Sequence, residues 1–164
     1  MYENISLFHA LDAWMTVYNG GSCMKNTALD IAKAIVDMCT SDGRPVSNLQ
    51  LQNILYYLQV NALHHGRPMF SDDFEAWQFG PVVPDVYYYY CGFGAEPIRM
   101  HYSTDIDART ELEIVTAVNL VRNAPFWDVS GNIQQSGKAW AAIYAGGFGS
   151  HYVIPRKLLA SDPL

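Results

Sequence analysis

Lysine and arginine are scarce in this chain and nowhere clustered. Ten basic residues stand against sixteen acidic ones among 164 residues, which gives a formal net charge of −6 at pH 7. Proteins that bind nucleic acid without regard to its sequence neutralise phosphates with clustered Lys and Arg. The scattered basic residues therefore argue against direct binding of DNA or RNA. The acidic balance fits a basic protein partner better.

Cysteine is also rare, and long apolar runs are missing. Cys23, Cys39 and Cys91 are odd in number and widely spaced, which is not the pattern of a disulfide framework or a zinc site. A reducing cytoplasm is the simplest compartment for such a chain. No stretch approaches the roughly 20 apolar residues of a membrane span, and the N-terminus, which carries Glu3, lacks the basic region of a signal peptide. We therefore expect a cytoplasmic protein with no membrane partner.

The sequence has no local motif for catalysis, metal binding or phosphate binding. His64 and His65 are adjacent, so their side chains diverge on a helix instead of converging on a metal ion. The glycines of residues 146–149 lack the lysine and the strand of a phosphate-binding loop, and we expect a turn there. We therefore expect no catalytic residue, no metal and no cofactor. A small hydrolase using Cys39 or Cys91 with a histidine is the less favoured alternative, because nothing resembles a nucleophile elbow.

The remaining composition predicts a folded, mainly α-helical protein. Half of the residues are hydrophobic and 13% are aromatic, which argues for a single compact helical domain. Apolar spacing and capping residues predict helices over 4–18, 27–39, 48–65, 84–91, 110–122 and 136–144, with a last turn at 155–160. We expect at most a short β element around residues 74–79 and 152–154. Residues 1–23 are interpreted as an N-terminal extension or accessory helix, or else as an ordinary first core helix, and residues 24–164 as the main domain.

The helix over residues 48–65 carries the strongest pattern. Its apolar stripe consists of Leu51, Ile54, Leu55, Leu58 and Ala62. Beside this stripe, Gln52, Tyr56 and Gln59 recur at helical spacing on a neighbouring face. We predict that these three side chains form an exposed strip of polar and aromatic groups.

Residues 73–87 suit neither an ordinary helix nor an ordinary strand. Pro81 and Pro84 remove backbone donors, and Gly80 marks a sharp change of chain direction. Alternation along an extended segment would place Trp77 and Phe79 on one side. We expect one side of the segment to be fixed in the core while its prolines and following tyrosines form a rigid edge.

Aromatic residues elsewhere are open to two readings. The tyrosines at 87–90 span about one helical turn, so at least one of them should face solvent or a partner. The four tryptophans (Trp14, Trp77, Trp127 and Trp140) are interpreted as core residues, with partner anchoring by one of them as the alternative.

Three segments, in their order along the chain, resemble one protein family. Residues 49–59 read LQLQNILYYLQ, close to the pattern Leu-x-Leu-Gln-Lys-Leu-Leu-Tyr-x-x-Gln, and are followed by GRPMF at 66–70 and FEAWQFGPVVPDVY at 74–87. Together they resemble the Panacea domain of SocA-like antitoxins and GepA-like phage-associated proteins. ALDIAK at 28–33 resembles the usual opening of that domain. Two departures are Asn53, where the family has Lys, and the missing His before Trp140.

The resemblance implies a non-enzymatic antitoxin that neutralises a protein toxin encoded next to it. Neutralisation would proceed by direct binding or by delivery of the toxin to the ClpXP protease. The compartment would be the cytoplasm of a prokaryotic cell, with the gene on the chromosome or on a phage or prophage. The alternative is a phage or mobile-element accessory protein that binds a host protein. The expected partner-binding residues are Gln52, Tyr56, Gln59, Trp77, Gly80, Pro81, Pro84 and Tyr87.

Overall fold

The computed structural model describes residues 26–163. This part of the chain contains seven α-helices, two 3₁₀ turns and one small sheet, so the predicted mainly α fold is confirmed. The elements are α2 (Ala28–Ser41), α3 (Asn48–His64), β1 (Glu75–Trp77), β2 (Gly80–Val82), α4 (Pro84–Tyr89), η1 (Cys91–Phe93), α5 (Ala108–Asn123), α6 (Phe126–Ile133), α7 (Ala139–Tyr144), η2 (Ala145–Gly147) and α8 (Arg156–Leu159). The helix predicted at 4–18, Trp14 and the boundary proposed after residue 23 lie outside the described residues.

The first two described helices begin at capping boxes. The Thr27 side chain accepts the N–H of Asp30, whose carboxylate in turn accepts the N–H of Thr27. Ser47 and Gln50 make the same reciprocal pair at the start of α3. Each box satisfies donors that the first helical turn leaves free, which is why these two starts were predicted to within a residue.

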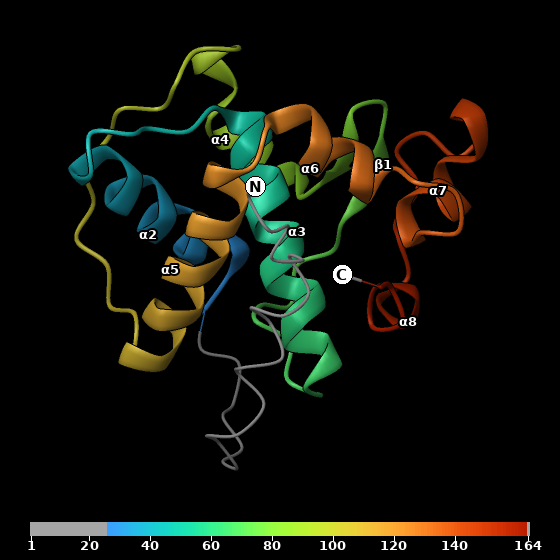
Figure 1. Ribbon diagram of the computed structural model, residues 1–164, viewed down its shortest axis with the longest axis horizontal. Helices are drawn as coiled ribbons and strands as arrows, with labels where there is room; N and C mark the ends of the chain where they lie inside the picture. Colours follow the sequence, from blue (N-terminus) through green and yellow to red (C-terminus); the bar gives the residue numbers. More distant parts are fainter. Residues whose placement is uncertain (1–25, 164) are drawn as a thin grey trace, which may run out of the picture.

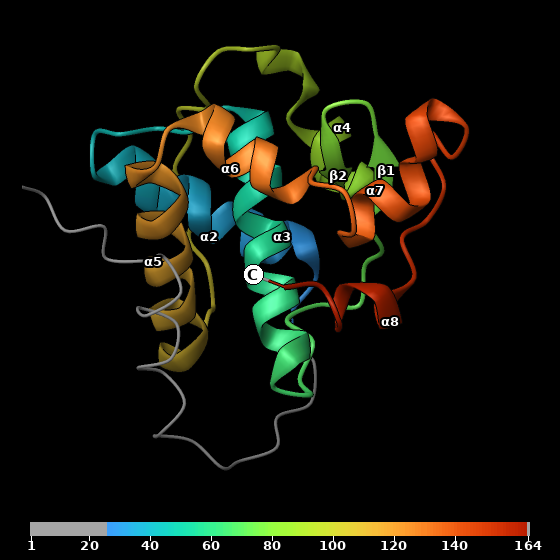
Figure 2. The ribbon, with the colours of Figure 1, turned by 45° about the vertical axis from the view of Figure 1, so that its right-hand side comes forward.

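Helix α3 lies in the middle of the molecule. Helices α2 and α5 pack against it on one side, and α6, α8 and β2 contact it elsewhere. Figures 1 and 2 both show α3 between the α2–α5 pair and the hairpin with α7. The predicted apolar stripe from Leu51 to Ala62 is buried throughout. Because neighbours surround the middle of α3, several of its polar side chains are buried as well.

The prediction that Gln52, Tyr56 and Gln59 form an exposed strip is wrong. Their exposed fractions are 0%, 2% and 1%, and that of Asn48, one turn before Gln52, is 3%. These four residues form what we call the α3 polar stripe. Burial of a polar group without a partner costs free energy, so each of them must find partners inside the protein. The partners are segments that follow α3 in the sequence.

Gln59 holds the chain that leaves α3. Its Oε1 atom accepts the N–H groups of Met69 (2.8 Å) and Phe70 (3.4 Å), and its Nε2 atom donates to the carbonyl of Phe70 (2.8 Å). The side-chain amide thus pairs with the backbone as a neighbouring strand would. Phe70 is thereby placed in the core, where it is fully buried.

Gln52 and Asn48 hold the start of α4. The Oε1 atom of Gln52 accepts the N–H of Val83 at 2.9 Å, and its Nε2 atom donates to Asn48 Oδ1 at 3.3 Å. Asn48 donates through Nδ2 to the carbonyl of Tyr87 at 3.0 Å. Pro84 is the first residue of α4, as predicted from the fixed φ of proline.

The β element is an antiparallel hairpin. Glu75 pairs with Val82, Ala76 with Pro81 and Trp77 with Gly80. The chain therefore turns at residues 78–79. The prediction that Trp77 and Phe79 lie on one side of a single extended segment is wrong, because Phe79 belongs to the turn. The predicted β contact near residue 153 is confirmed as an isolated antiparallel bridge between Glu75 and Val153.

Helix α6 was not predicted, and α7 begins three residues later than predicted. Pro125 has no N–H with which to continue α5, and it is the N-cap of α6. Before α7, Lys138 is extended and Gly137 has a φ of +89°. That conformation favours glycine and cannot continue a helix.

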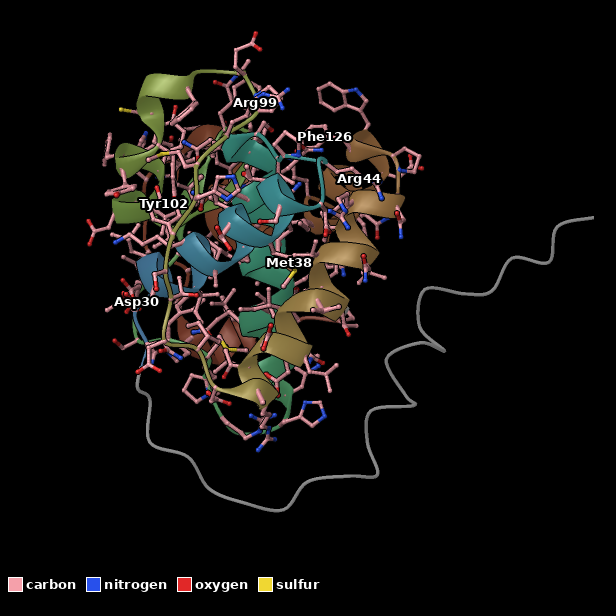
Figure 3. The ribbon with its side chains drawn as sticks, turned by 90° about the vertical axis from the view of Figure 1, so that its left-hand side faces the viewer. Asp30, Met38, Arg44, Arg99, Tyr102 and Phe126 are labelled. Carbon is pink, nitrogen blue, oxygen red and sulfur yellow. The ribbon has the colours of Figure 1, made fainter. Side chains whose placement is uncertain are left out.

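Residues 98–107 lie across α2, as Figure 3 shows from that side. Asp37 on α2 holds them, since its Oδ1 atom accepts the N–H of Tyr102 at 3.0 Å and lies 3.1 Å from His101 Nδ1. Arg44 contacts the end of α5, where its guanidinium donates to Asn123 Oδ1 at 3.4 Å and to the carbonyl of Arg122 at 3.5 Å. Residues 98–107 form neither helix nor strand.

The last described residues fasten α7 to α3. Asp162 is 3% exposed. One of its carboxylate oxygens accepts the hydroxyl of Tyr56 at 2.5 Å, and the other accepts the N–H of Ala139 at 2.7 Å. Lys138 adds a bond from Nζ to the carbonyl of Pro163. Burial and the Asp162 carboxylate raise the pKa of Tyr56, so the hydroxyl stays protonated and keeps donating.

We predict that Tyr56→Phe lowers the free energy of unfolding by about 1–3 kcal/mol, because the buried Asp162 carboxylate loses a donor. Chemical denaturation measures the change. Tyr88→Phe is the matched control, since Tyr88 is 60% exposed and its change should stay within about 0.5 kcal/mol. Equal values for the two variants would contradict the proposed role of Asp162.

Candidate functional site

The four consecutive tyrosines point in different directions, as predicted. Tyr90 is fully buried and Tyr87 is half-buried, whereas Tyr88 is 60% and Tyr89 is 47% exposed. Tyr89 also lies near Lys33, whose Nζ atom is 5.3 Å from the ring centroid. Tyr87 and Tyr88 therefore lie at the surface on the side of the hairpin.

Trp77 is the centre of a surface cluster of rings. Its ring centroid lies 4.8 Å from that of Tyr87, 5.9 Å from Tyr88 and 4.5 Å from His151. These four residues form what we call the hairpin aromatic cluster. Tilted and edge-on ring contacts at such distances stabilise one arrangement of the rings. The cluster joins β1, α4 and the loop after α7, which are far apart in the sequence.

Glu75 fixes the orientation of the Trp77 indole. Its Oε2 atom accepts the indole N–H at 2.8 Å and lies 3.6 Å from His151 Nδ1. His151 has a φ of +66°, a left-handed conformation that is uncommon for residues other than glycine. In that conformation its N–H donates to the carbonyl of Ala76 at 2.8 Å. The backbone strain is thus offset by a β-type hydrogen bond and by ring contact.

The hairpin is held from three sides. Trp140 on α7 donates its indole N–H to the carbonyl of Trp77 at 2.9 Å. Gln134, just after α6, donates through Nε2 to the carbonyl of Phe79 at 3.0 Å. On the third side is the Gln52 bond to Val83. A surface fixed in this way is preorganised, which lowers the entropy cost of binding a partner.

Large exposed side chains lie close to the cluster residues in the sequence. Phe79 at the hairpin turn is 61% exposed, Tyr152 is 66% exposed and Val153 is 49% exposed. Large exposed apolar side chains that gather in one region of a protein are typical of interaction sites. Glu75 and the exposed Asp85 supply negative charge at the same region.

The residues predicted to bind a partner divide into three groups. Gly80 and Pro81 are buried in the sheet, and Pro84 is half-buried, so the rigid edge expected from the prolines is inside. Trp77 and Tyr87 belong to the hairpin aromatic cluster. The third group, Gln52, Tyr56 and Gln59, belongs to the α3 polar stripe. Sequence reasoning missed Tyr88, His151 and Tyr152 as surface groups, although the tyrosine run itself was a signal for Tyr88.

Two tryptophans behave differently from one another. Trp140 is 7% exposed, which confirms the core interpretation. Trp127 is 77% exposed at the start of α6, with its ring 5.0 Å from that of Phe126, so the core interpretation is wrong for it. Trp127 lies two residues after Pro125, in the first turn of α6.

Other chemical features of residues 26–163 are modest. Cys39 is buried and Cys91 is exposed, and both are free thiols. Burial raises the pKa of the Cys39 thiol, which disfavours the thiolate that a nucleophile requires. Within the same residues, no three His, Cys, Asp or Glu side chains gather as a metal site would need. None of the described helices has the length and apolarity to cross a bilayer.

Comparison with known proteins confirms the resemblance predicted from the motifs. Residues 51–128 match the family model described as "Antitoxin SocA-like, Panacea domain". Antitoxin SocA of Caulobacter vibrioides (strain NA1000 / CB15N) is 31% identical over 96 residues, which cover 58% of this chain and 47% of that relative. The chain thus spans about half the length of this curated relative. No solved structure matches.

We predict that Gly149→Ala disturbs the loop that carries His151. A Cβ atom at this position would lie 1.8 Å from the carbonyl oxygen of Ile143 and 2.9 Å from its carbonyl carbon. Because these are backbone atoms, the loop must move, and the free energy of unfolding should fall by about 1–3 kcal/mol. Chemical denaturation followed by tryptophan fluorescence measures the loss.

Gly92→Ala is the matched control for Gly149→Ala. An added Cβ at Gly92 meets no atom within 4 Å, so this variant should unfold as the wild type does. Wild-type stability in Gly149→Ala would show that the loop between α7 and residue 151 yields easily and does not fix the cluster.

Proposed function

We propose that this chain, with its SocA-like Panacea domain at residues 51–128, is an antitoxin that neutralises a protein toxin encoded next to it, in the cytoplasm of a prokaryotic cell. The likeness to Antitoxin SocA supports the antitoxin role. The chain acts by binding and needs no catalytic residue of its own. The single observation that carries the mode of action is the hairpin aromatic cluster.

The hairpin aromatic cluster has the properties of a contact site for a protein. Trp and Tyr are enriched in the few residues that carry most of the binding energy at interfaces. Here Tyr88 is exposed beside a half-buried Trp77, and Phe79 and Tyr152, close in the sequence to Trp77 and His151, are exposed too. Because hydrogen bonds fix the backbone on three sides, little order has to be gained on binding. This arrangement supports neutralisation by direct contact.

Charge supports a basic partner. The chain has a formal net charge of −6, and Glu75 and Asp85 lie at or beside the cluster. Opposite charge on the toxin would speed association and orient the encounter. A cationic side chain of the toxin could also stack over an exposed ring.

Co-expression with the adjacent open reading frame tests the antitoxin role. The adjacent gene alone should stop growth, and this chain should restore it. A host lacking ClpXP separates the two routes of neutralisation: rescue in that host supports blocking by direct contact, and rescue that requires ClpXP supports delivery of the toxin for proteolysis. Equal growth arrest with and without this chain would contradict the antitoxin role. A neighbour without toxicity would favour an accessory protein that acts on a host factor.

We predict that Tyr88→Ala weakens binding of the adjacent gene product by at least about tenfold, because truncation of an interface aromatic commonly costs about 2 kcal/mol or more. Isothermal titration calorimetry with the purified proteins measures the affinity. The fold should be intact, since Tyr88 is 60% exposed.

Two variants serve as comparisons for Tyr88→Ala. Leu112→Ala on α5 removes a side chain with 56% exposure and should leave the affinity within about twofold. Trp127→Ala tests the rival aromatic corner at the start of α6. A large loss with Trp127→Ala and none with Tyr88→Ala would move the contact site to that corner.

A further inference from the structure

The small sheet has two edges with different properties. Ala76 directs its N–H and C=O toward residues 151–152, with its N–H donated to the carbonyl of Tyr152 at 2.9 Å. Successive residues of a strand direct these groups to opposite sides, so Glu75 and Trp77 direct theirs toward β2. Pro81, opposite Ala76, therefore faces outward from β2 and has no N–H to offer. The next outward N–H on that edge, of Val83, is taken by Gln52.

The other edge is formed by residues 152–154 and remains open at Val153. The bonds that flank the Glu75–Val153 bridge run from Ala76 N to Tyr152 O and from Ile154 N to Phe74 O, the latter at 2.7 Å. Val153 therefore directs its own N–H and C=O away from β1. Among the described residues no group bonds to either of them, and Val153 is 49% exposed. An unpaired edge of this kind is a template for a strand from another chain.

We propose that an extended segment of the toxin adds to the sheet at Val153 as a further antiparallel strand. This inference rests on the proposed function. The incoming strand would exchange two main-chain hydrogen bonds with Val153, and its side chains would lie against His151, Tyr152 and the hairpin aromatic cluster. Main-chain bonds position such a segment, and side-chain contacts select it.

The site favours a segment with apolar side chains and a nearby Lys or Arg. Val153 stands opposite Glu75, so their side chains share one face of the sheet. That face also carries Trp77, and it combines a carboxylate with exposed apolar groups. The contact at Val153 is short because Pro155 follows it and has no N–H. Only one residue pair can therefore form, and most of the affinity must come from side chains.

Val153→Pro tests strand addition directly. The substitution removes an N–H that no described group uses, so the fold should persist. It should weaken binding of the adjacent gene product by at least about tenfold, since the matching carbonyl of the partner is left without a donor. Val153→Thr is the matched control, with similar shape and the same N–H, and should bind within about twofold of the wild type.

Amide hydrogen exchange on the wild type gives a second readout that does not depend on how Val153→Pro folds. The Val153 amide should exchange at least about tenfold more slowly in the complex than in the free protein. An unchanged rate at Val153 in a complex that Tyr88→Ala weakens would overturn strand addition and leave the proposed function standing. A wild type that does not bind the adjacent gene product would overturn both. A wild-type dimer that Val153→Pro dissociates would assign the edge to a second copy of this chain and overturn the proposal.

Discussion

The need to satisfy buried polar groups on α3 is the constraint on which the rest of the structure depends. Asn48, Gln52, Tyr56 and Gln59 lie along one side of a helix that is surrounded by neighbours. Each therefore bonds to a later segment, and a buried donor or acceptor left without a partner costs about 1–3 kcal/mol. The backbone at Met69–Phe70, Val83 and Tyr87 and the Asp162 carboxylate are the partners. Irregular backbone is thus held in place by a regular helix.

This constraint links the core to the surface. Gln52 and Asn48 fix the backbone around α4, and α4 presents Tyr87 and Tyr88 beside Trp77. Tyr56 holds Asp162, which caps α7, and Trp140 of α7 holds the carbonyl of Trp77. The hairpin aromatic cluster is therefore rigid, because the segments that hold it are themselves held by side chains of α3. The α3 motif that resembles the SocA-like family is largely internal scaffold, and the surface that it positions is the contact site we propose.

Local signals in the sequence predicted the parts of the fold that depend on local physics. The capping residues before α2 and α3, the proline at the start of α4 and the apolar stripe of α3 were all recognisable. The burial of Gln52 was not, because helical spacing shows only that polar groups share a face and not what covers that face. His151 escaped detection for a similar reason, since it reaches Trp77 only through long-range packing and a left-handed backbone.

Amide hydrogen exchange at Val83 tests the central claim most directly, because this N–H bonds to the Gln52 side chain. In the wild type, Val83 should exchange only through global unfolding. In Gln52→Ala the Val83 amide should exchange through local opening. The Met69 amide, which bonds to Gln59, should stay as protected as the other core amides of that variant. Rapid exchange of Val83 in the wild type, or a rate that Gln52→Ala does not change relative to Met69, would contradict the account.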